Sequence, residues 1–402
     1  MLGLKRDFNL MGKYLSKPVT SKEHQKGTGS DFKWGLASMQ GWRCTMEDTF
    51  IVESSLGNLK TFSLFLVLDG FGGSKFADCM SQEFSAFLIE HKVFMKLNDG
   101  DDYQPNELAD AFKQSLLNFD EKMRDVPDLN NSGCTVTGVL ITPNHFVIAN
   151  LGDSRTVVCR QNEILFSSVD HSPSTITERK RIVAAGGVVY KNRINGDLNV
   201  SRSLGNYQMK NDNRKRKICQ LLSPEADVTV LERSRDQDDF IAIASDGVFR
   251  SFSNSDLVDY LVKRIPYKRH LDDLVGEILD YCCHSRTRDN LTMILIHFDS
   301  SNIQREDVKI DHDEKLDDNI RELTRNYIEE AFADGRQAYG WEPCFRKLED
   351  LHTDLFSDEK NTQNFGIQLK KGVIYAEFDK GTSAIRNARR KEACQRLMLA
   401  EI

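Results

Sequence analysis

Residues 39–48 read MQGWRCTMED and residues 69–73 read DGFGG, two short runs that combine acidic side chains with glycine. The second run follows the apolar residues 62–68, so Asp69 stands at the end of an expected strand. A carboxylate at a strand end can face a pocket that holds solvent, where it stays ionised without being buried unpaired. We therefore expect a functional group at this strand end.

The same arrangement recurs further along the chain. Asp153 and Asp246 each follow an expected strand, and Asp289 directly precedes another. Oxygen ligands of this kind favour Mg²⁺ or Mn²⁺, and a pair of such ions can hold a phosphate oxygen and lower the pKa of a bridging water. Because a single Asp-Gly pair is usually only a turn, the prediction of a metal centre rests on the ordered set.

The composition limits the class of protein. The 402 residues are 40% hydrophobic and 29% charged, which excludes collagen-like, disordered and membrane-spanning proteins for the bulk of the chain. The formal charge of -7 argues against nucleic-acid binding by the whole molecule. The nine cysteines include no CxxC pair, and the chain has neither a secretory signal nor an apolar run long enough to cross a membrane. We therefore expect a cytoplasmic protein, with the nucleus as an alternative.

The sequence predicts four segments. Residues 1–31 lack periodicity and are expected to form a flexible N-terminal arm. In residues 32–299, strands and helices come in clusters rather than in strict alternation, which favours antiparallel sheets with helices outside. Residues 300–335 are expected to form a charged linker and a helix, and residues 336–402 a small α+β domain with a basic C-terminal helix.

The ordered motifs resemble those of the metal-dependent serine/threonine protein phosphatases of type 2C. The resemblance covers about residues 34–298 and rests on the two runs quoted above and on later blocks in the same order. These blocks are Gly152-Asp153-Ser154-Arg155, Asp170-His171-Ser172-Pro173, Ala185-Gly186-Gly187-Val188, Arg193-Ile194-Asn195-Gly196, Ser201-Arg202-Ser203-Leu204-Gly205, Ser223-Pro224-Glu225, Ser245-Asp246-Gly247 and Arg288-Asp289-Asn290. The resemblance implies an α/β (α+β) sandwich of two antiparallel β-sheets flanked by helices.

The resemblance also implies a centre with two Mg²⁺ or Mn²⁺ ions that acts on phosphoproteins. Oxygen atoms would provide the metal sites: Asp69, Gly70, Asp246 and Asp289 directly, and Glu47 and Asp48 through water. Arg43 would hold the substrate phosphate.

The chain departs from the family pattern at three positions. Phe71 stands where the family has a histidine that protonates the leaving oxygen, a contribution typically worth about 10²- to 10⁴-fold in rate. Arg250 stands where an aspartate usually helps Asp153 and Asp246 to hold a third metal, so we expect its guanidinium to pair with one of these carboxylates. Asn206 stands where an aspartate is usual, and the sequence suggests no role for it.

These departures leave two functions open. The first is a phosphatase of reduced activity, which cleaves phosphoserine and phosphothreonine through water activated by two metals. The second is a catalytically impaired pseudophosphatase that binds phosphoproteins as a scaffold.

Two further features suggest binding partners. Gly12 lies in a Met-Gly run that fits the N-myristoylation pattern if a product begins at Met11, and such a product would contact membranes through a lipid anchor. The run RKRK at residues 214–217 would select acidic phosphopeptides or act as a nuclear signal, and a solvated loop is the alternative.

The tail weakly resembles a double-stranded-RNA-binding domain. Its expected last helix carries the candidate RNA or partner contacts Arg386, Arg389, Arg390 and Lys391. A protein-docking or purely structural module is the alternative.

Overall fold

The computed structural model describes residues 14–126, 128–267, 270–285, 287–299, 301, 303 and 321–329. Internal contacts divide the chain into one unit of residues Met1–Gln304 and another of residues Arg305–Ile402. The described part of the second unit is a helix over residues 321–329, inside the segment expected to hold a linker and a helix. Gly12 and residues 336–402, with the four basic candidate contacts, lie outside the described residues and stay predictions. Among the described helices, none combines the length and the apolar character that a membrane crossing requires.

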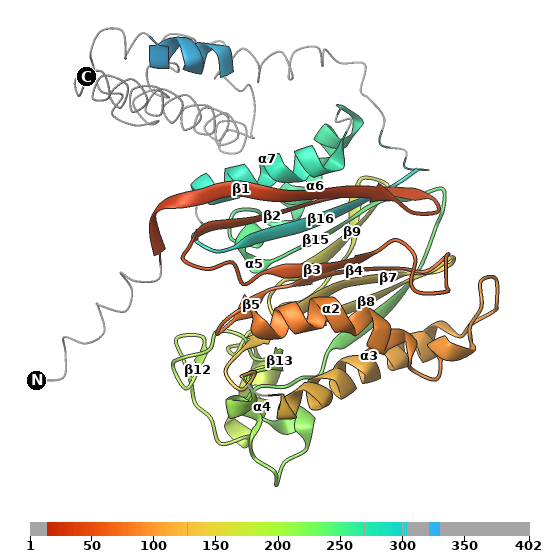
Figure 1. Cartoon of the computed structure of the whole chain (residues 1–402), viewed down its shortest axis with the longest axis vertical. Coiled ribbons are helices and arrows are strands. Elements are labelled where there is room, and N and C mark those ends of the chain that lie inside the picture. The colour runs from red at the N-terminus through yellow and green to blue at the C-terminus, as the bar shows by residue number, and fades with distance from the viewer. Residues whose placement is uncertain are drawn as a thin grey trace, which may run out of the picture. The chain divides into compact units, whose positions relative to one another are not determined.

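Two antiparallel sheets of the first unit pack face to face, as the sequence predicts (Figure 1). The strand order of the first sheet is β1 (Tyr14–Thr28), β2 (Phe32–Arg43), β16 (Leu291–Phe298), β15 (Asp238–Ala244), β9 (Arg155–Arg160) and β10 (Glu163–Ser167). The order of the second is β14 (Asp227–Glu232), β8 (His145–Leu151), β7 (Val136–Ile141), β4 (Ser63–Leu68) and β3 (Thr49–Glu53). The β7–β8 hairpin turns at residues 142–144, where Thr142-Pro143-Asn144 has the composition of a turn.

Helices cover both outer faces of the sandwich (Figure 1). The first sheet is covered by α6 (Asn254–Arg264) and α7 (Leu271–Ser285), and the second by α2 (Lys75–Ile89) and α3 (Pro105–Lys122). Short 3-10 helices lie in the connections: η1 (Phe94–Lys96), η2 (Met123–Asp125), η3 (Tyr207–Lys210), η4 (Lys217–Cys219) and η5 (Ile265–Tyr267).

The central strands are apolar on both faces because each face meets another layer. In β4, Phe65 and Val67 lie in the core between the two sheets, whereas Leu64, Leu66 and Leu68 lie in the core under α2 and α3. Successive side chains of a strand point to opposite faces, so one continuous apolar run supplies two cores.

Strand β1 corrects the prediction that residues 1–31 form a flexible arm. Within this segment, Tyr14–Thr28 pair with β2 in a register that runs from Tyr14↔Arg43 to Thr28↔Lys33. No residue of β1 is buried, because the strand lies at the sheet edge with neither face in the core. The apolar alternation that would reveal a strand in the sequence is therefore missing, and backbone hydrogen bonds with ion pairs hold the segment instead.

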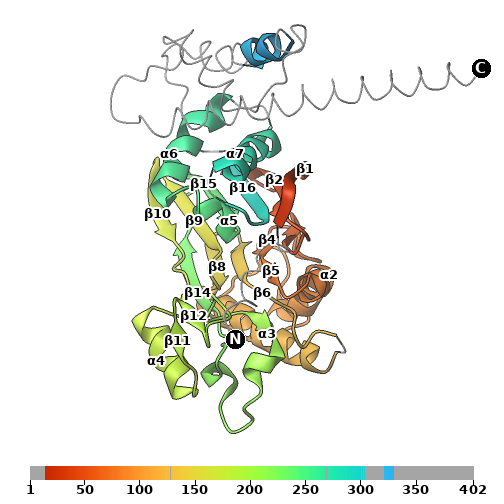
Figure 2. The same ribbon diagram turned by 90° about the vertical axis from the view of Figure 1, so that its left-hand side faces the viewer.

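Small elements lie at one end of the sandwich and below its second sheet (Figure 2). They are the sheet of β13 (Leu204–Gly205), β6 (Gly133–Cys134) and β5 (Gly70–Phe71), the hairpin of β11 (Val189–Tyr190) and β12 (Arg193–Ile194), and the helices α4 (Ile176–Ala184) and α5 (Asp246–Phe249). Asn206, which follows β13, has a left-handed backbone with φ 49° and donates its N–H to the carbonyl of Ser132 over 2.8 Å. Because asparagine tolerates this conformation better than most residues, its role here is conformational.

A buried ion pair fixes the position of β13. The Lys210 ammonium donates to Asp120 Oδ1 over 2.8 Å and to the Ser203 carbonyl over 2.9 Å, and the Gly205 N–H donates to the same Asp120 oxygen over 2.7 Å. The two side chains are only 1% and 3% exposed. Through β6, this pair also supports β5, the strand that carries Phe71.

Replacing Lys210 with methionine is expected to lower the free energy of unfolding by about 3 to 5 kcal/mol, because Asp120 would be left as an uncompensated buried charge. Denaturant titration followed by fluorescence measures the loss. Lys75→Met removes an exposed ion pair to Asp128 and serves as the matched control, with an expected loss of about 0 to 1 kcal/mol. Equal losses in the two variants would contradict the prediction.

Candidate metal centre

Three carboxylates from separate strands converge at this end of the sandwich. Asp69 follows β4, Asp153 follows β8 and Asp246 follows β15, each within two residues of the strand end. One carboxylate oxygen from each lies within 4.8 Å of those from the other two, and all three residues are half-buried. Because the sandwich aligns these strand ends, residues far apart in the chain form one acidic cluster.

Arg250 links this cluster to Asp289. Its guanidinium pairs with Asp246, four residues earlier, and lies 3.2 Å from Asp289 Oδ2. The pairing with Asp246 is one of the two that the sequence suggests, and the contact with Asp289 is an addition. An arginine therefore provides positive charge inside a set of residues with the chemistry of metal ligands.

Arg43 also binds Asp289. Its Nε donates to Asp289 Oδ1 over 2.8 Å, and its terminal nitrogen donates to Oδ2 over 3.0 Å. This bidentate arrangement is the one that arginine also forms with phosphate. The Arg43 side chain is 37% exposed, so its head group is accessible to a ligand.

Both carboxylate oxygens of Glu47 accept hydrogen bonds. Its carboxylate accepts a hydrogen bond from the Thr45 hydroxyl over 2.7 Å and one from the Gly73 N–H over 3.0 Å. The Gly70 N–H donates to the Glu47 carbonyl over 3.1 Å, and a Cβ at Gly70 would lie 2.2 Å from that carbonyl oxygen. Only glycine fits at position 70, and its place beside Glu47 is therefore fixed by close backbone contact.

Asp48 is the buried member of the group. Its Oδ2 atom has no hydrogen-bond partner within the described part of the chain. Burial, and then the negative charge of Asp289, raises the pKa of Asp48 to about 7. A buried oxygen without a partner is costly unless a cation or a water satisfies it.

Burial and mutual repulsion also act on the other carboxylates. Burial, and then the charge of Asp48, raises the pKa of Asp69 well above its usual range. Burial and the charge of Asp246 do the same for the pKa of Asp153, and burial raises the pKa of Asp246 against the opposing effect of Arg250. Negative charge is in excess here, and oxygen donors predominate, so the residues fit hard divalent cations.

Phe71 contributes no titratable group to this end of the sandwich. Its ring packs on the neighbouring strand, where a Cβ at Gly133 would lie 2.9 Å from the ring Cζ atom. The position that the sequence assigns to a general acid therefore holds an apolar ring against backbone.

Asn290 supports the segment that carries Arg43 and Glu47, a role that the sequence did not reveal. Its side-chain amide donates to the carbonyls of Gln40 and Thr45 over 2.8 and 2.9 Å, and its Oδ1 accepts the Glu47 N–H over 2.9 Å. It thereby holds the Arg43–Glu47 segment against the start of β16. The sequence does offer one signal for this role. Asn290 is a polar amide that stands between Asp289 and the apolar run of residues 291–298.

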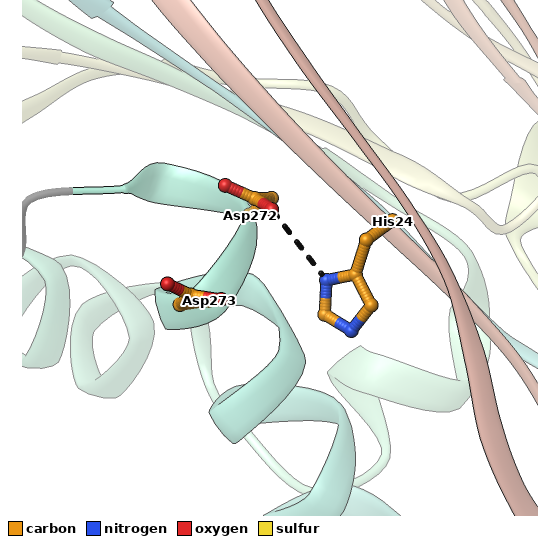
Figure 3. A group of neighbouring side chains, drawn as sticks. All are labelled: His24, Asp272 and Asp273. Atoms are coloured by element: carbon orange, nitrogen blue, oxygen red, sulfur yellow. Dashed lines mark ion pairs between the residues drawn. The ribbon is translucent and has the colours of Figure 1, made fainter.

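A second group of potential ligands lies on the outer side of the first sheet, where His24 of β1 approaches Asp272 and Asp273 of α7 (Figure 3). His24 Nδ1 lies 3.9 Å from Asp272 Oδ2, and Lys26 Nζ lies 3.4 Å from Asp272 Oδ1. The lysine already supplies positive charge, and acidic residues in a first helical turn are stabilised by the helix dipole. The group is therefore an ion-pair contact between β1 and α7 rather than a metal site.

Comparison with known proteins gives consistent matches. The family model described as Protein phosphatase 2C matches residues 32–291. Protein phosphatase ppm-1.A of Caenorhabditis elegans is 36% identical over 341 residues, which cover 81% of this chain and 72% of that protein. Protein phosphatase 1B of Mus musculus is 35% identical over 336 residues, which cover 81% of this chain and 86% of that protein. The crystal structure of serine-threonine phosphatase 2C from Toxoplasma gondii has the same fold, with a TM-score of 0.59 at 19% identity over 69% of this chain and 99% of that one.

Proposed function

Because the chain belongs to the protein phosphatase 2C family, and is by family a metal-dependent serine/threonine phosphatase, we propose that it uses two Mg²⁺ or Mn²⁺ ions to hydrolyse phosphoserine and phosphothreonine at a reduced rate. The observation that carries the proposal is the convergence of Asp69, Asp153 and Asp246 within 4.8 Å. The buried, unpartnered Oδ2 atom of Asp48, within the part of the chain that the structure describes, supports it.

The proposal assigns a role to five of the acidic residues. Asp69, Asp246 and Asp289 would hold the cations directly, together with the carbonyl of Gly70. Glu47 and Asp48 would act through water, in line with the hydrogen bonds that already engage both oxygens of Glu47. Bound divalent cations would supply Lewis acidity, which neutralises phosphate oxygens and acidifies water.

Arg43 would bind the substrate phosphate. Its partly exposed guanidinium has the paired donors that match two phosphate oxygens, and in this structure Nε and one terminal nitrogen bind Asp289. Asn290 keeps the Arg43 segment in place through three hydrogen bonds, so the arginine is positioned before the substrate arrives. The leaving serine or threonine oxygen must take a proton, and Phe71 cannot give one, which is the reason for the reduced rate.

The second candidate function is a pseudophosphatase scaffold, and Arg250 is the observation that favours it. Its guanidinium contacts Asp246 and Asp289, two of the three proposed direct carboxylate ligands. If this contact outcompetes cations, phosphoproteins would bind through Arg43 without being hydrolysed.

An activity assay separates the two candidates. The purified chain is incubated with Mn²⁺ and either a phosphothreonine peptide or an aryl phosphate, with Asp246→Asn as the inactive reference. Turnover that a chelator and the substitution both abolish supports the enzyme. Phosphopeptide binding with no turnover on either substrate would overturn it in favour of the scaffold.

Arg250 is also expected to limit the number of metal sites. Calorimetric titration with Mn²⁺ should report no more than two sites in the unmodified protein, and Arg250→Asp should add a weak third one, because a carboxylate replaces a cation beside Asp153 and Asp246. Arg179→Asp, at an exposed position on α4, is the matched control and should add none. A third site in the unmodified protein would show that the guanidinium does not block it.

A further inference from the structure

We propose that Tyr14 is a positioning residue for Arg43, because its ring lies over the guanidinium groups of Arg43 and Arg288 beside the acidic centre. The inference rests on the proposed role of Arg43 in phosphate binding. It gives the N-terminal strand β1 a part in the recognition of substrate.

The ring lies at similar distances from both arginines. The Cζ atom of Arg43 is 5.8 Å from the centroid of the Tyr14 ring, and the Cζ atom of Arg288 is 5.7 Å from it. Both distances are within the range of cation–π attraction, and arginine is the cation most often found in such contacts. The electron-rich face of one ring therefore moderates the repulsion between two like charges.

The contact with Tyr14 matters because Asp289, which also holds the Arg43 head group, is a proposed metal ligand. The side-chain hydrogen bonds of Arg43 go to Asp289, which is also a proposed metal ligand. A carboxylate that binds a cation has less capacity to hold a guanidinium, so in the metal-loaded protein the Tyr14 ring becomes the main restraint on the Arg43 head group. A long side chain without such a restraint would lose rotamer entropy on binding phosphate, and affinity would fall.

The pairing of β1 with β2 places the Tyr14 ring beside Arg43. Tyr14 is the direct partner of Arg43 in the β1–β2 ladder, and the register shifts between Tyr14 and Val19. Directly opposed residues on antiparallel strands have side chains close enough to interact. A second shift lies between Val19 and Lys22, and such irregularities are common near functional sites.

Ion pairs hold the rest of β1 on α7 and keep this register. Lys22 pairs with Asp280 over 2.8 Å, and Lys26 lies near Asp272. His24 also approaches Asp272 (Figure 3), so alternate residues of one strand face meet the same helix. The His24 ring also lies against the helix backbone, since a Cβ at Gly276 would be 2.7 Å from its Cε1 atom. A bare glycine at this point lets the strand and the helix approach closely.

The test compares Tyr14→Leu, which removes the ring, with Tyr14→Phe, which keeps it. In the full chain loaded with Mn²⁺, Tyr14→Leu is expected to weaken the binding of inorganic phosphate and to raise KM for a phosphothreonine peptide, both about 3- to 10-fold, with kcat changed little. Tyr14→Phe should stay near the unmodified protein. Ser21→Ala, at an exposed position on the same strand, is the matched control.

A second readout needs no activity. Phenylglyoxal labelling of Arg43, measured with and without Mn²⁺ and quantified by peptide mass spectrometry, should be faster in Tyr14→Leu than in Tyr14→Phe. The difference should be larger with Mn²⁺, because Asp289 also holds Arg43 when no cation is bound. The labelling rate of Arg43 is divided by that of the exposed Arg179, which corrects for a general loosening of the structure. An unchanged Arg43 rate overturns the inference, as does a fall in kcat with KM unaltered. If the unmodified protein binds no phosphate at all, the proposed function fails, and the labelling ratio still decides whether Tyr14 holds Arg43.

Discussion

Phe71→His is expected to raise turnover on phosphothreonine peptides by about 10-fold or more, and turnover on an aryl phosphate by less. An alkoxide leaving group needs a proton, whereas an aryl oxide leaves without one. The substitution restores a titratable group directly after Gly70, beside the acidic centre. The ratio of the two gains, measured with both substrates under the same Mn²⁺ concentration, is the diagnostic quantity.

The pH profile gives a second signature of the restored acid. The gain should be confined to the pH range in which imidazole is protonated, so it should decline above about pH 7. Phe71→Gln is the matched control, because it adds polarity without a group that titrates near neutral pH. Equal gains on the two substrates would instead indicate better binding of metal or substrate. No gain on either would make Arg250 or weak metal binding the limiting factor.

Asp69→Asn is expected to have opposite effects on the metal-free and metal-loaded protein. Without metal, burial and the charges of the neighbouring aspartates raise the pKa of Asp69, so folding must either protonate this carboxyl or bury its charge. The amide of asparagine avoids that cost, so the melting temperature should rise. With Mn²⁺ at about 100 times its Kd, the unmodified protein gains roughly 2.7 kcal/mol of stability, and the variant should gain almost none and lose all turnover.

Thermal unfolding with and without Mn²⁺ measures both effects in one experiment. Asp110→Asn, at an exposed position on α3, is the matched control and should change neither curve. A variant that is destabilised without metal and still stabilised by Mn²⁺ would contradict the proposed role of Asp69.

The sequence predicts the parts of the fold that depend on local patterns. The apolar run that ends at Asp69 and the one that ends near Asp246 both become strands, and the turn at residues 142–144 joins β7 and β8. Because the acidic residues stand next to these strands in the chain, the sequence alone is enough to propose the cluster.

The features that the sequence does not reveal depend on tertiary contacts. Lys210 pairs with a residue 90 positions away, and each partner alone is an ordinary charged residue. The contact of Arg250 with Asp289 depends on the turn of α5 meeting the start of β16. Strand β1 cannot be recognised in the sequence for a different reason. It is a polar edge strand that buries no residue, so it lacks the apolar alternation that predicts strands.

The pairing of β2 with β16 has a consequence for the synthesis of the protein. These strands carry the Ser38 and Thr292 hydroxyls, 2.8 Å apart in space and 254 positions apart in sequence, and β16 is the neighbour that joins β2 to the rest of its sheet. A ribosome adds about 5 to 20 residues per second, so β2 waits on the order of 10 to 50 s with one edge unpaired. During that time its apolar residues and free backbone groups are exposed to other nascent chains. We therefore expect this sheet to close only after Phe298 has left the ribosome exit tunnel, and chaperones that bind extended apolar segments to raise the yield of folded protein.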